Sequence, residues 1–136
     1  MKHFCISFFL LIALSVMLPF SCFANKTVTV LYSGDIFGNI VPTTFCYSNK
    51  NMGGLARIAT LAEEARETEE EVLLLDSGNM FPVYAVGPKL IAEFGLKAMN
   101  EMEYTAMNLG WNDLGFGTRF LENFSGSLGF PFITSN

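Results

Sequence analysis

Histidine is almost absent from this chain of 136 residues, in which His3 is the single example. Imidazole is the side chain best suited to exchange a proton near neutral pH, and it is the commonest metal ligand in proteins. His3 lies at the start of an apolar N-terminal stretch, so the residues after that stretch contain no imidazole. This absence argues against histidine-dependent catalysis and histidine metal sites in the rest of the chain.

Cysteine is also scarce, with three residues, Cys5, Cys22 and Cys46. They form no Cys-x-x-Cys motif and no cluster with histidine, which excludes the usual structural zinc site. If the N-terminal stretch is removed after export, Cys46 alone remains and cannot form an internal disulfide. Its thiol is then reactive, intermolecular or buried and inert, so Cys46 is a candidate redox residue.

The N-terminal segment has the composition of a secretory signal. A short basic start precedes an unbroken apolar run from Phe4 to Leu18, and small residues follow up to Ala24. The run is too short, and wrongly flanked, for a comfortable membrane span. We expect residues 1–24 to be a signal peptide and the protein to be exported, either periplasmic or extracellular. The alternatives are a lipid anchor on Cys22 and a retained membrane anchor.

Basic residues are outnumbered, with 8 Lys and Arg against 13 Asp and Glu. Without the leader, which holds Lys2 and no acid, seven bases face the thirteen acids and the net charge is −6. Such a balance favours solubility and argues against a surface for nucleic acid or anionic lipid. We therefore expect no nucleic-acid partner, and a membrane partner only through a lipidated Cys22 or a retained leader.

The chain after the leader alternates short apolar runs with helical patterns. Strands are predicted at residues 28–31, 72–75, 104–107 and 131–135, and helices from residue 53, from residue 88 and around residues 120–124. This order is typical of right-handed βαβ units and predicts an α/β fold with a parallel sheet. Because the strand runs are continuously apolar, we expect both faces of the sheet to be covered. Since only two helices are long, residues 25–136 are interpreted as the incomplete front part of a larger domain.

Apolar spacing also predicts which face each long helix buries. The first helix has its stripe at Leu55, Ile58, Ala59, Ala62 and Ala65. The second is expected to turn inward Leu90, Ile91, Phe94, Ala98 and Met102. Pro88 suits the first turn of this second helix, whereas Gly95 weakens the prediction at its centre.

Polar clusters follow three of the predicted strands, at residues 34–39, 76–79 and 108–113. Sites in open α/β sheets form at the carboxyl ends of strands, so the chain has the layout of an active site. Asp35 is either a functional carboxylate there or a cap of its own turn. Asp76 is interpreted as structural, and Asp113 as a solvated loop residue, a cap or a ligand. Trp111 either fills a void or offers a stacking platform for a base or sugar.

These motifs, taken in order, resemble a known family. They are Gly34-Asp35-x-Phe37-Gly38, Gly53-Gly54-Leu55-Ala56-Arg57, Leu73 to Asn79, Met107 to Asp113, and Pro131 to Asn136. Residues 25–136 are similar to the amino-terminal catalytic domain of exported 5′-nucleotidases and UDP-sugar hydrolases, which are calcineurin-like metallophosphoesterases. The resemblance implies a four-layer α/β/β/α sandwich with two metal ions at strand ends. Within this group the chain resembles most the UshA-like (seleno)proteins, in which a cysteine or selenocysteine lies near the first loop, as Cys46 does here.

The resemblance also implies where the first metal ligands would lie. Asp35 matches the aspartate of an Asp-x-His motif, but Phe37 stands at its histidine. Asn79 stands at the aspartate that bridges both metals. A phenyl ring donates no lone pair, and a neutral amide cannot offset the charge of two close cations as a bridging carboxylate does.

The third motif of the family, Gly-Asn-His-Glu, departs in the same way. Trp111 stands at the metal-binding asparagine, Asn112 at the catalytic histidine and Asp113 at the glutamate. Indole is a donor only, so Trp111 cannot ligate a metal. Asp35, Asn79 and Asp113 are thus the remaining candidate metal ligands, suited to one weakly bound hard ion such as Ca²⁺ or Mg²⁺.

We therefore expect a divergent, exported 5′-nucleotidase-like protein with weak or no hydrolase activity. Its ligand would be a nucleotide, another small phosphate ester or a single divalent metal ion. Two alternatives stay open. One is a phosphoester hydrolase completed by ligands from a missing carboxyl-terminal part, and the other is a thiol redox protein that uses Cys46.

Overall fold

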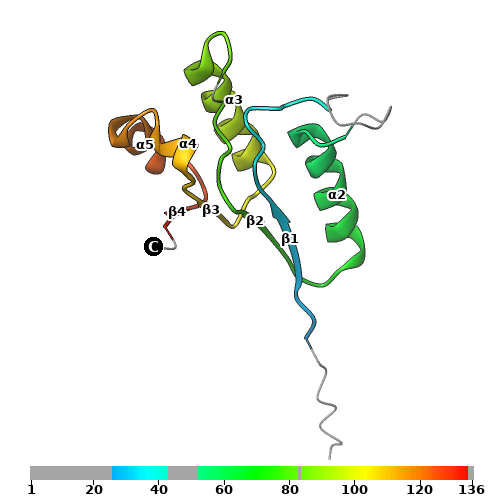
Figure 1. Cartoon of the computed structure of the whole chain (residues 1–136). Coiled ribbons are helices and arrows are strands. Elements are labelled where there is room, and N and C mark those ends of the chain that lie inside the picture. The colour runs from blue at the N-terminus through cyan, green and yellow to red at the C-terminus, as the bar shows by residue number, and fades with distance from the viewer. Residues whose placement is uncertain (1–25, 43–51, 83, 135–136) are drawn as a thin grey trace, which may run out of the picture.

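The computed structural model describes residues 26–42, 52–82 and 84–134. Within these residues four parallel strands form one sheet, in the order β1-β2-β3-β4 (Figure 1). The strands are β1 (Thr29–Ser33), β2 (Val72–Asp76), β3 (Ala106–Asn108) and β4 (Phe132–Ile133). The helices are α2 (Leu55–Thr68), α3 (Pro88–Glu101), α4 (Trp111–Leu114) and α5 (Thr118–Ser125). The predicted α/β fold with a parallel sheet is confirmed. The leader and Cys46 lie outside the described residues, so the predictions made for them stay predictions.

The two long helices lie on the same side of the sheet (Figure 1). Helix α2 begins directly after Gly54 and buries Leu55 and Ala62, as its apolar spacing predicts. Near its end, the Arg66 guanidinium donates to the backbone oxygen of Met102, at 2.7 Å, just after α3. This bond joins the carboxyl-terminal ends of the two helices. None of the described helices is long and apolar enough to cross a bilayer.

The buried face of α3 differs from the one predicted. Leu90 and Phe94 are 59% and 58% exposed, so the prediction that they point inward is wrong. The sheet-facing side is formed instead by Ala92, Gly95, Leu96 and Met99. Since α3 is apolar around much of its circumference, spacing alone could not select the face that the sheet covers.

Gly95 lets this face of α3 accommodate a side chain from the loop after β2. A Cβ atom added at Gly95 would lie 1.6 Å from the Cε atom of Met80. Met80 is fully buried in the loop after β2. The missing side chain therefore makes room for Met80, at a helix-forming cost of about 1 kcal/mol for an internal glycine.

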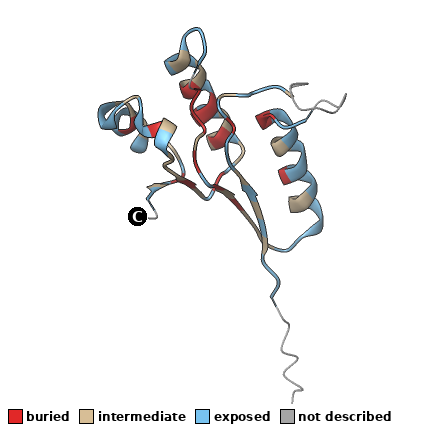
Figure 2. Cartoon of the chain, viewed as in Figure 1, coloured by how far each residue is buried: buried red, intermediate tan, exposed pale blue. Residues whose placement is uncertain are grey.

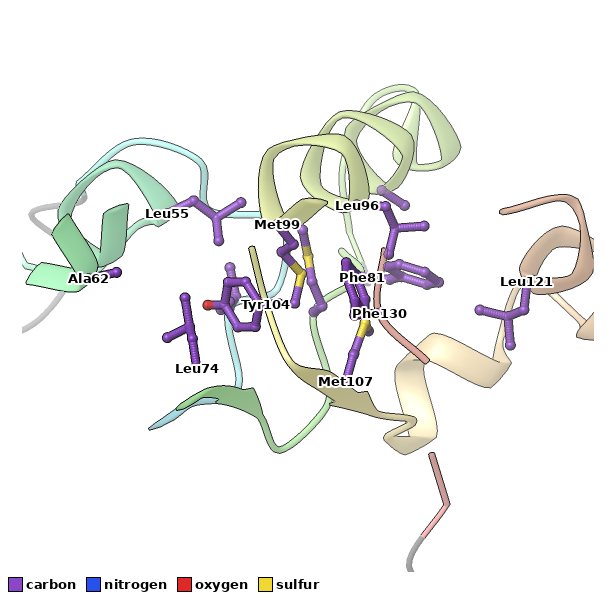
Figure 3. Packing of buried hydrophobic residues seen from close by; sticks show 13 residues of the cluster. Leu55, Ala62, Leu74, Phe81, Leu96, Met99, Tyr104, Met107, Leu121 and Phe130 are labelled. Atoms are coloured by element: carbon purple, nitrogen blue, oxygen red, sulfur yellow. The ribbon is translucent and has the colours of Figure 1, made fainter. Parts of the chain in front are cut away.

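The core lies between the sheet and these helices (Figure 2). Figure 3 shows Leu96 and Met99 of α3 pointing toward the sheet, where Leu74 and Met107 point back toward them. Further along the chain, aromatic rings attach α5 and the residues before it. Phe81 stacks on Phe116, with centroids 5.4 Å apart, and meets Phe120 of α5 edge to face, with centroids 5.5 Å apart.

One face of β1 is not covered by any described residue. Val30 and Tyr32 are exposed, whereas Leu31 and Ser33, which alternate with them, are partly buried. The expectation that β1 is covered on both faces is therefore wrong for the described part of the chain. The second sheet of a four-layer sandwich is likewise not among these residues, and it stays an expectation from the family resemblance.

Candidate functional site

The loops that follow β1 and β2 run side by side at the carboxyl edge of the sheet. The backbone N–H groups of Asp35, Phe37 and Gly38 donate to the backbone oxygens of Gly78, Asn79 and Met80, at 2.9, 3.0 and 2.7 Å. The parallel pairing of the strands thus continues into their loops. Candidate residues from two separate sequence motifs are brought together in this way.

Asp113 attaches a third loop, which follows β3, to the same edge. Its side chain is fully buried. One carboxylate oxygen accepts from the backbone N–H groups of Asn79 and Gly110, both at 2.8 Å, and the other accepts from that of Phe81 at 2.9 Å. The interpretation of Asp113 as a solvated loop residue is wrong, because the structure makes it a buried cap that holds α4 against the β2 loop.

Burial raises the pKa of Asp113 above its usual value, and the backbone N–H groups around it oppose that shift. Because both carboxylate oxygens already accept hydrogen bonds, a metal would have to compete with the backbone for them. Ligation of a metal by Asp113 stays a prediction.

Asn79 lies at the centre of the edge. Its backbone is in the left-handed region, with φ 58°, a conformation that asparagine tolerates better than most residues. The side-chain Nδ2 donates to the Asp35 carboxylate at 2.9 Å, and Oδ1 accepts from the backbone N–H of Asn112 at 3.2 Å. Three of the candidate residues are therefore joined in one hydrogen-bonded chain.

Trp111 opens the short helix α4 beside this chain, and 86% of its surface is exposed. It does not fill a void, so that interpretation is wrong. A ring so exposed next to polar side chains is available for stacking. Its use as a substrate platform stays a prediction, as does the role of Asn112 at the family's histidine position.

A buried network beneath the edge was not anticipated from the sequence. Asp76 accepts from the Ser33 hydroxyl at 2.6 Å and from the Gly78 backbone N–H at 2.8 Å. The Ser33 and Tyr104 hydroxyls lie 2.8 Å apart. Burial raises the pKa of Asp76 to about 6 and that of Tyr104 to about 12. The structural interpretation of Asp76 agrees with these contacts. Ser33 and Asp76 are partners in the parallel register of β1 and β2, which the sequence alone does not reveal.

The loops meet so closely that glycine is required where they touch. A Cβ atom at Gly78 would lie 2.7 Å from the backbone nitrogen of Gly110, and Gly78 has φ 108°. Both the clash and the backbone conformation disfavour any other residue.

We expect Gly78→Ala to destabilise the chain by about 2 kcal/mol, since strained backbone of this kind costs roughly 1–3 kcal/mol. Urea denaturation would measure the change. Gly126→Ala is the matched control, because nothing lies within 4 Å of a Cβ there and its φ is −88°. Equal stability of the two variants would contradict the close approach of the loops.

A cavity of about 570 Å³ adjoins the β1 loop. It is lined by Phe37, Gly38, Asn39, Pro82, Tyr84, Ala85 and Ile91. Phe37 thus borders both the cavity and the strand-end chain of Asp35 and Asn79. Across the described residues, no group of three or more histidine, cysteine, aspartate or glutamate side chains is placed to hold a metal ion.

Comparison with known proteins gives relatives of one kind. The 5′-nucleotidase of Rattus norvegicus is 31% identical in an alignment that covers 93% of this chain and 23% of the relative. The 2′,3′-cyclic-nucleotide 2′-phosphodiesterase/3′-nucleotidase of Yersinia enterocolitica is 28% identical over 124 residues, which cover 83% of this chain and 19% of the relative. The chain thus spans about a fifth of the length of these relatives. No protein-family profile matches it.

Solved structures agree with the sequence matches. The calcineurin-like phosphoesterase YfkN from Bacillus subtilis superposes with a TM-score of 0.57 at 27% identity, over 78% of this chain and 36% of that protein. A 5′-nucleotidase precursor from Thermus thermophilus gives a TM-score of 0.67 at 24% identity, over 80% of this chain and 22% of that protein. This likeness supports the fold. The predicted resemblance to the 5′-nucleotidases is confirmed: the chain belongs to the 5′-nucleotidase family, and its described residues form part of the calcineurin-like phosphoesterase fold.

Proposed function

We propose that this chain is an exported 5′-nucleotidase-like protein whose strand-end site no longer carries out two-metal hydrolysis. It binds a nucleotide or another small phosphate ester with the help of one hard divalent ion at Asp35. Hydrolysis by this chain is weak or absent. The names of the two relatives given above state that these proteins act on nucleotides, which supports a nucleotide-sized phosphate ester as the ligand.

The observation that carries this proposal is the hydrogen bond that the neutral Asn79 side chain donates to Asp35. A residue that bridges two cations must present negative charge and free lone pairs to both. Asn79 presents a neutral amide instead, and its Nδ2–H group points at the Asp35 carboxylate. A donor N–H aimed at this carboxylate is incompatible with a cation in the same place. The donor set therefore does not fit a two-metal centre.

Neighbouring positions support the same conclusion. Phe37 and Trp111, which stand at two further ligand positions implied by the family resemblance, offer no lone pair to a metal ion. Asn112 cannot protonate a leaving group, because an amide does not titrate near neutral pH. At the described strand-end positions, the side chains therefore offer neither the ligand set for two metal ions nor the proton donor that such hydrolysis needs.

The charge of the site supports the need for one ion. Asp35, Asp76 and Asp113 lie near enough that the first and third raise the pKa of the second. A phosphate dianion would be repelled by these carboxylates unless a cation lay between them. Asp35 is exposed and one of its carboxylate oxygens accepts from Asn79, so the other is the better placed to bind such an ion. Hard ions with oxygen ligands, such as Ca²⁺ and Mg²⁺, suit a carboxylate of this kind.

We expect the full chain to hydrolyse p-nitrophenyl phosphate and nucleoside monophosphates at least about 100-fold more slowly than a histidine-containing 5′-nucleotidase, since a general acid contributes roughly 10²–10⁴-fold. Turnover would be measured with Mn²⁺, Zn²⁺ and Mg²⁺, alongside elemental analysis of the purified protein. Two tightly bound transition-metal ions per molecule, with fast nucleotide hydrolysis, would contradict the proposal.

The short span of the chain relative to its relatives favours one second candidate. The chain spans about a fifth of the length of these relatives. The second candidate is therefore a phosphoester hydrolase whose remaining metal ligands come from other parts of a longer protein. The same assay on the longest reading frame that contains this sequence separates the two candidates.

For the alternative based on Cys46, thiol labelling of the folded protein across a pH range would reveal a thiolate with a lowered pKa.

A further inference from the structure

We infer that Asn79 is an amide clamp that holds the three strand-end loops together in the place where a cation would otherwise join them. The inference rests on the proposed function in one respect, namely that no metal pair occupies this edge. It assigns a structural task to a residue that the proposed function describes only as a lost ligand.

Asn79 uses both of its backbone groups on different loops. Its backbone N–H donates to Asp113 at 2.8 Å, on the loop after β3. Its backbone oxygen accepts from the N–H of Phe37 at 3.0 Å, on the loop after β1. The backbone of this one residue, which belongs to the loop after β2, therefore touches both neighbouring loops.

The side chain repeats the same two connections. Nδ2 donates to Asp35 at 2.9 Å on the first loop, and Oδ1 accepts from the N–H of Asn112 at 3.2 Å on the third. An amide can do this because it has a donor and an acceptor on opposite sides. The two contacts also fix which way the amide lies, since the carboxylate requires a donor and the N–H requires an acceptor.

Charge explains why an amide and not a carboxylate performs this task. A carboxylate at position 79 would place its oxygen about as far from Asp35 as Nδ2 is now, and the two negative charges would repel each other. A cation between them would be needed to hold the loops. The neutral amide removes that need and replaces the repulsion with a hydrogen bond.

The test compares a single variant at Asn79 with a double variant in which the side chains of Asp35 and Asn79 are exchanged. Thermal unfolding of the full chain is measured in EDTA. Asn79→Asp is expected to lower the midpoint by about 5 °C, since 1 kcal/mol corresponds to roughly 4–8 °C in a domain of this size. The double variant Asp35→Asn/Asn79→Asp restores an amide facing a carboxylate and keeps an acceptor for Asn112. It is expected to recover most of the loss, because contacting residues are coupled.

Asn112→Asp is the matched control, because it adds the same charge at the same edge and keeps the backbone N–H that Asn79 binds. Its midpoint should lie within about 2 °C of that of the parent chain. In a second arm, Mn²⁺ should raise the midpoint of Asn79→Asp by more degrees than that of the parent chain.

Three results would overturn the clamp. They are an Asn79→Asp variant as stable as the parent in EDTA, a double variant no more stable than the single one, and a parent chain stabilised by Mn²⁺ as much as Asn79→Asp is. The EDTA comparison contains no metal and no substrate, so its failure is distinct from a failure of the proposed function, which the turnover assay detects.

Discussion

Replacing Asp113 by alanine is expected to lower the free energy of unfolding by about 3–4 kcal/mol, because each buried donor left without a partner costs roughly 1–3 kcal/mol. The substitution removes the acceptor from three backbone N–H groups, those of Asn79, Phe81 and Gly110. These groups belong to two different loops, so the loss also detaches α4 from the β2 loop. Urea denaturation of the full chain measures the effect.

Two companions separate the role of the carboxylate from general damage. Asp113→Asn keeps one acceptor oxygen and should lose less stability than Asp113→Ala. Asn112→Ala, one residue earlier on the same short helix, removes a side chain but leaves its backbone N–H in place, and should be close to neutral. If Asp113→Ala costs less than about 1 kcal/mol, the three hydrogen bonds do not hold the loops as the structure indicates.

The second large effect is a dependence of stability on pH that originates at Asp76. This carboxyl is 3% exposed, and burial raises its pKa from 3.8 to about 6, while the Ser33 and Gly78 hydrogen bonds act in the opposite direction. Between these two values the folded chain holds a proton that the unfolded chain has released. The folded state is therefore favoured at low pH, and this contribution is lost as the pH rises through about 6.

The difference between 3.8 and about 6 corresponds to about 3 kcal/mol, so stability should fall by up to this amount between pH 4 and pH 7. Asp113, whose pKa is also raised, contributes in the same direction. Asp76→Asn isolates the first contribution. Its amide can accept from Gly78 and donate to Ser33, and it does not titrate.

The comparison is made by urea denaturation of the parent chain and Asp76→Asn at pH 4, 5, 6 and 7. The gap between them should widen in favour of Asp76→Asn as the pH rises. A constant gap across this range would show that the folded and unfolded states of Asp76 share one pKa, and would remove the buried network with Ser33 and Tyr104 as a source of pH dependence.

Much of the fold could be predicted from local patterns. The runs that became β1 and β2 were found within two residues of their bounds, because uninterrupted apolar stretches closed by glycine and polar residues are typical of buried parallel strands. The start of α3 at Pro88 followed from its fixed φ angle. The grouping of Asp35, Asn79 and Asp113 followed from the parallel topology, since the carboxyl ends of parallel strands share one edge.

Several features could not be found in this way. Leu90 and Phe94 were assigned to the core because a helix that is apolar on most sides has no unique buried face in its sequence. One prediction for Trp111 was that it fills a void, because a large ring is usually buried. The turn into α4 instead directs the ring to solvent. In both cases the outcome depends on where a neighbouring element lies, and no short-range pattern contains that information.

The amino-acid sequence by itself determined the chemical character of this protein: the kinship with the 5′-nucleotidases, the parallel α/β order, and the residue types at Phe37, Asn79 and Trp111. The tertiary structure alone decided what the remaining polar groups do. Burial and hydrogen bonding are properties of three dimensions, so only the folded chain could show that Asp113 caps backbone N–H groups and that Asn79 joins three loops. A residue type limits the bonds that a side chain can make, but its partners are chosen by the packing of segments that are distant in the chain.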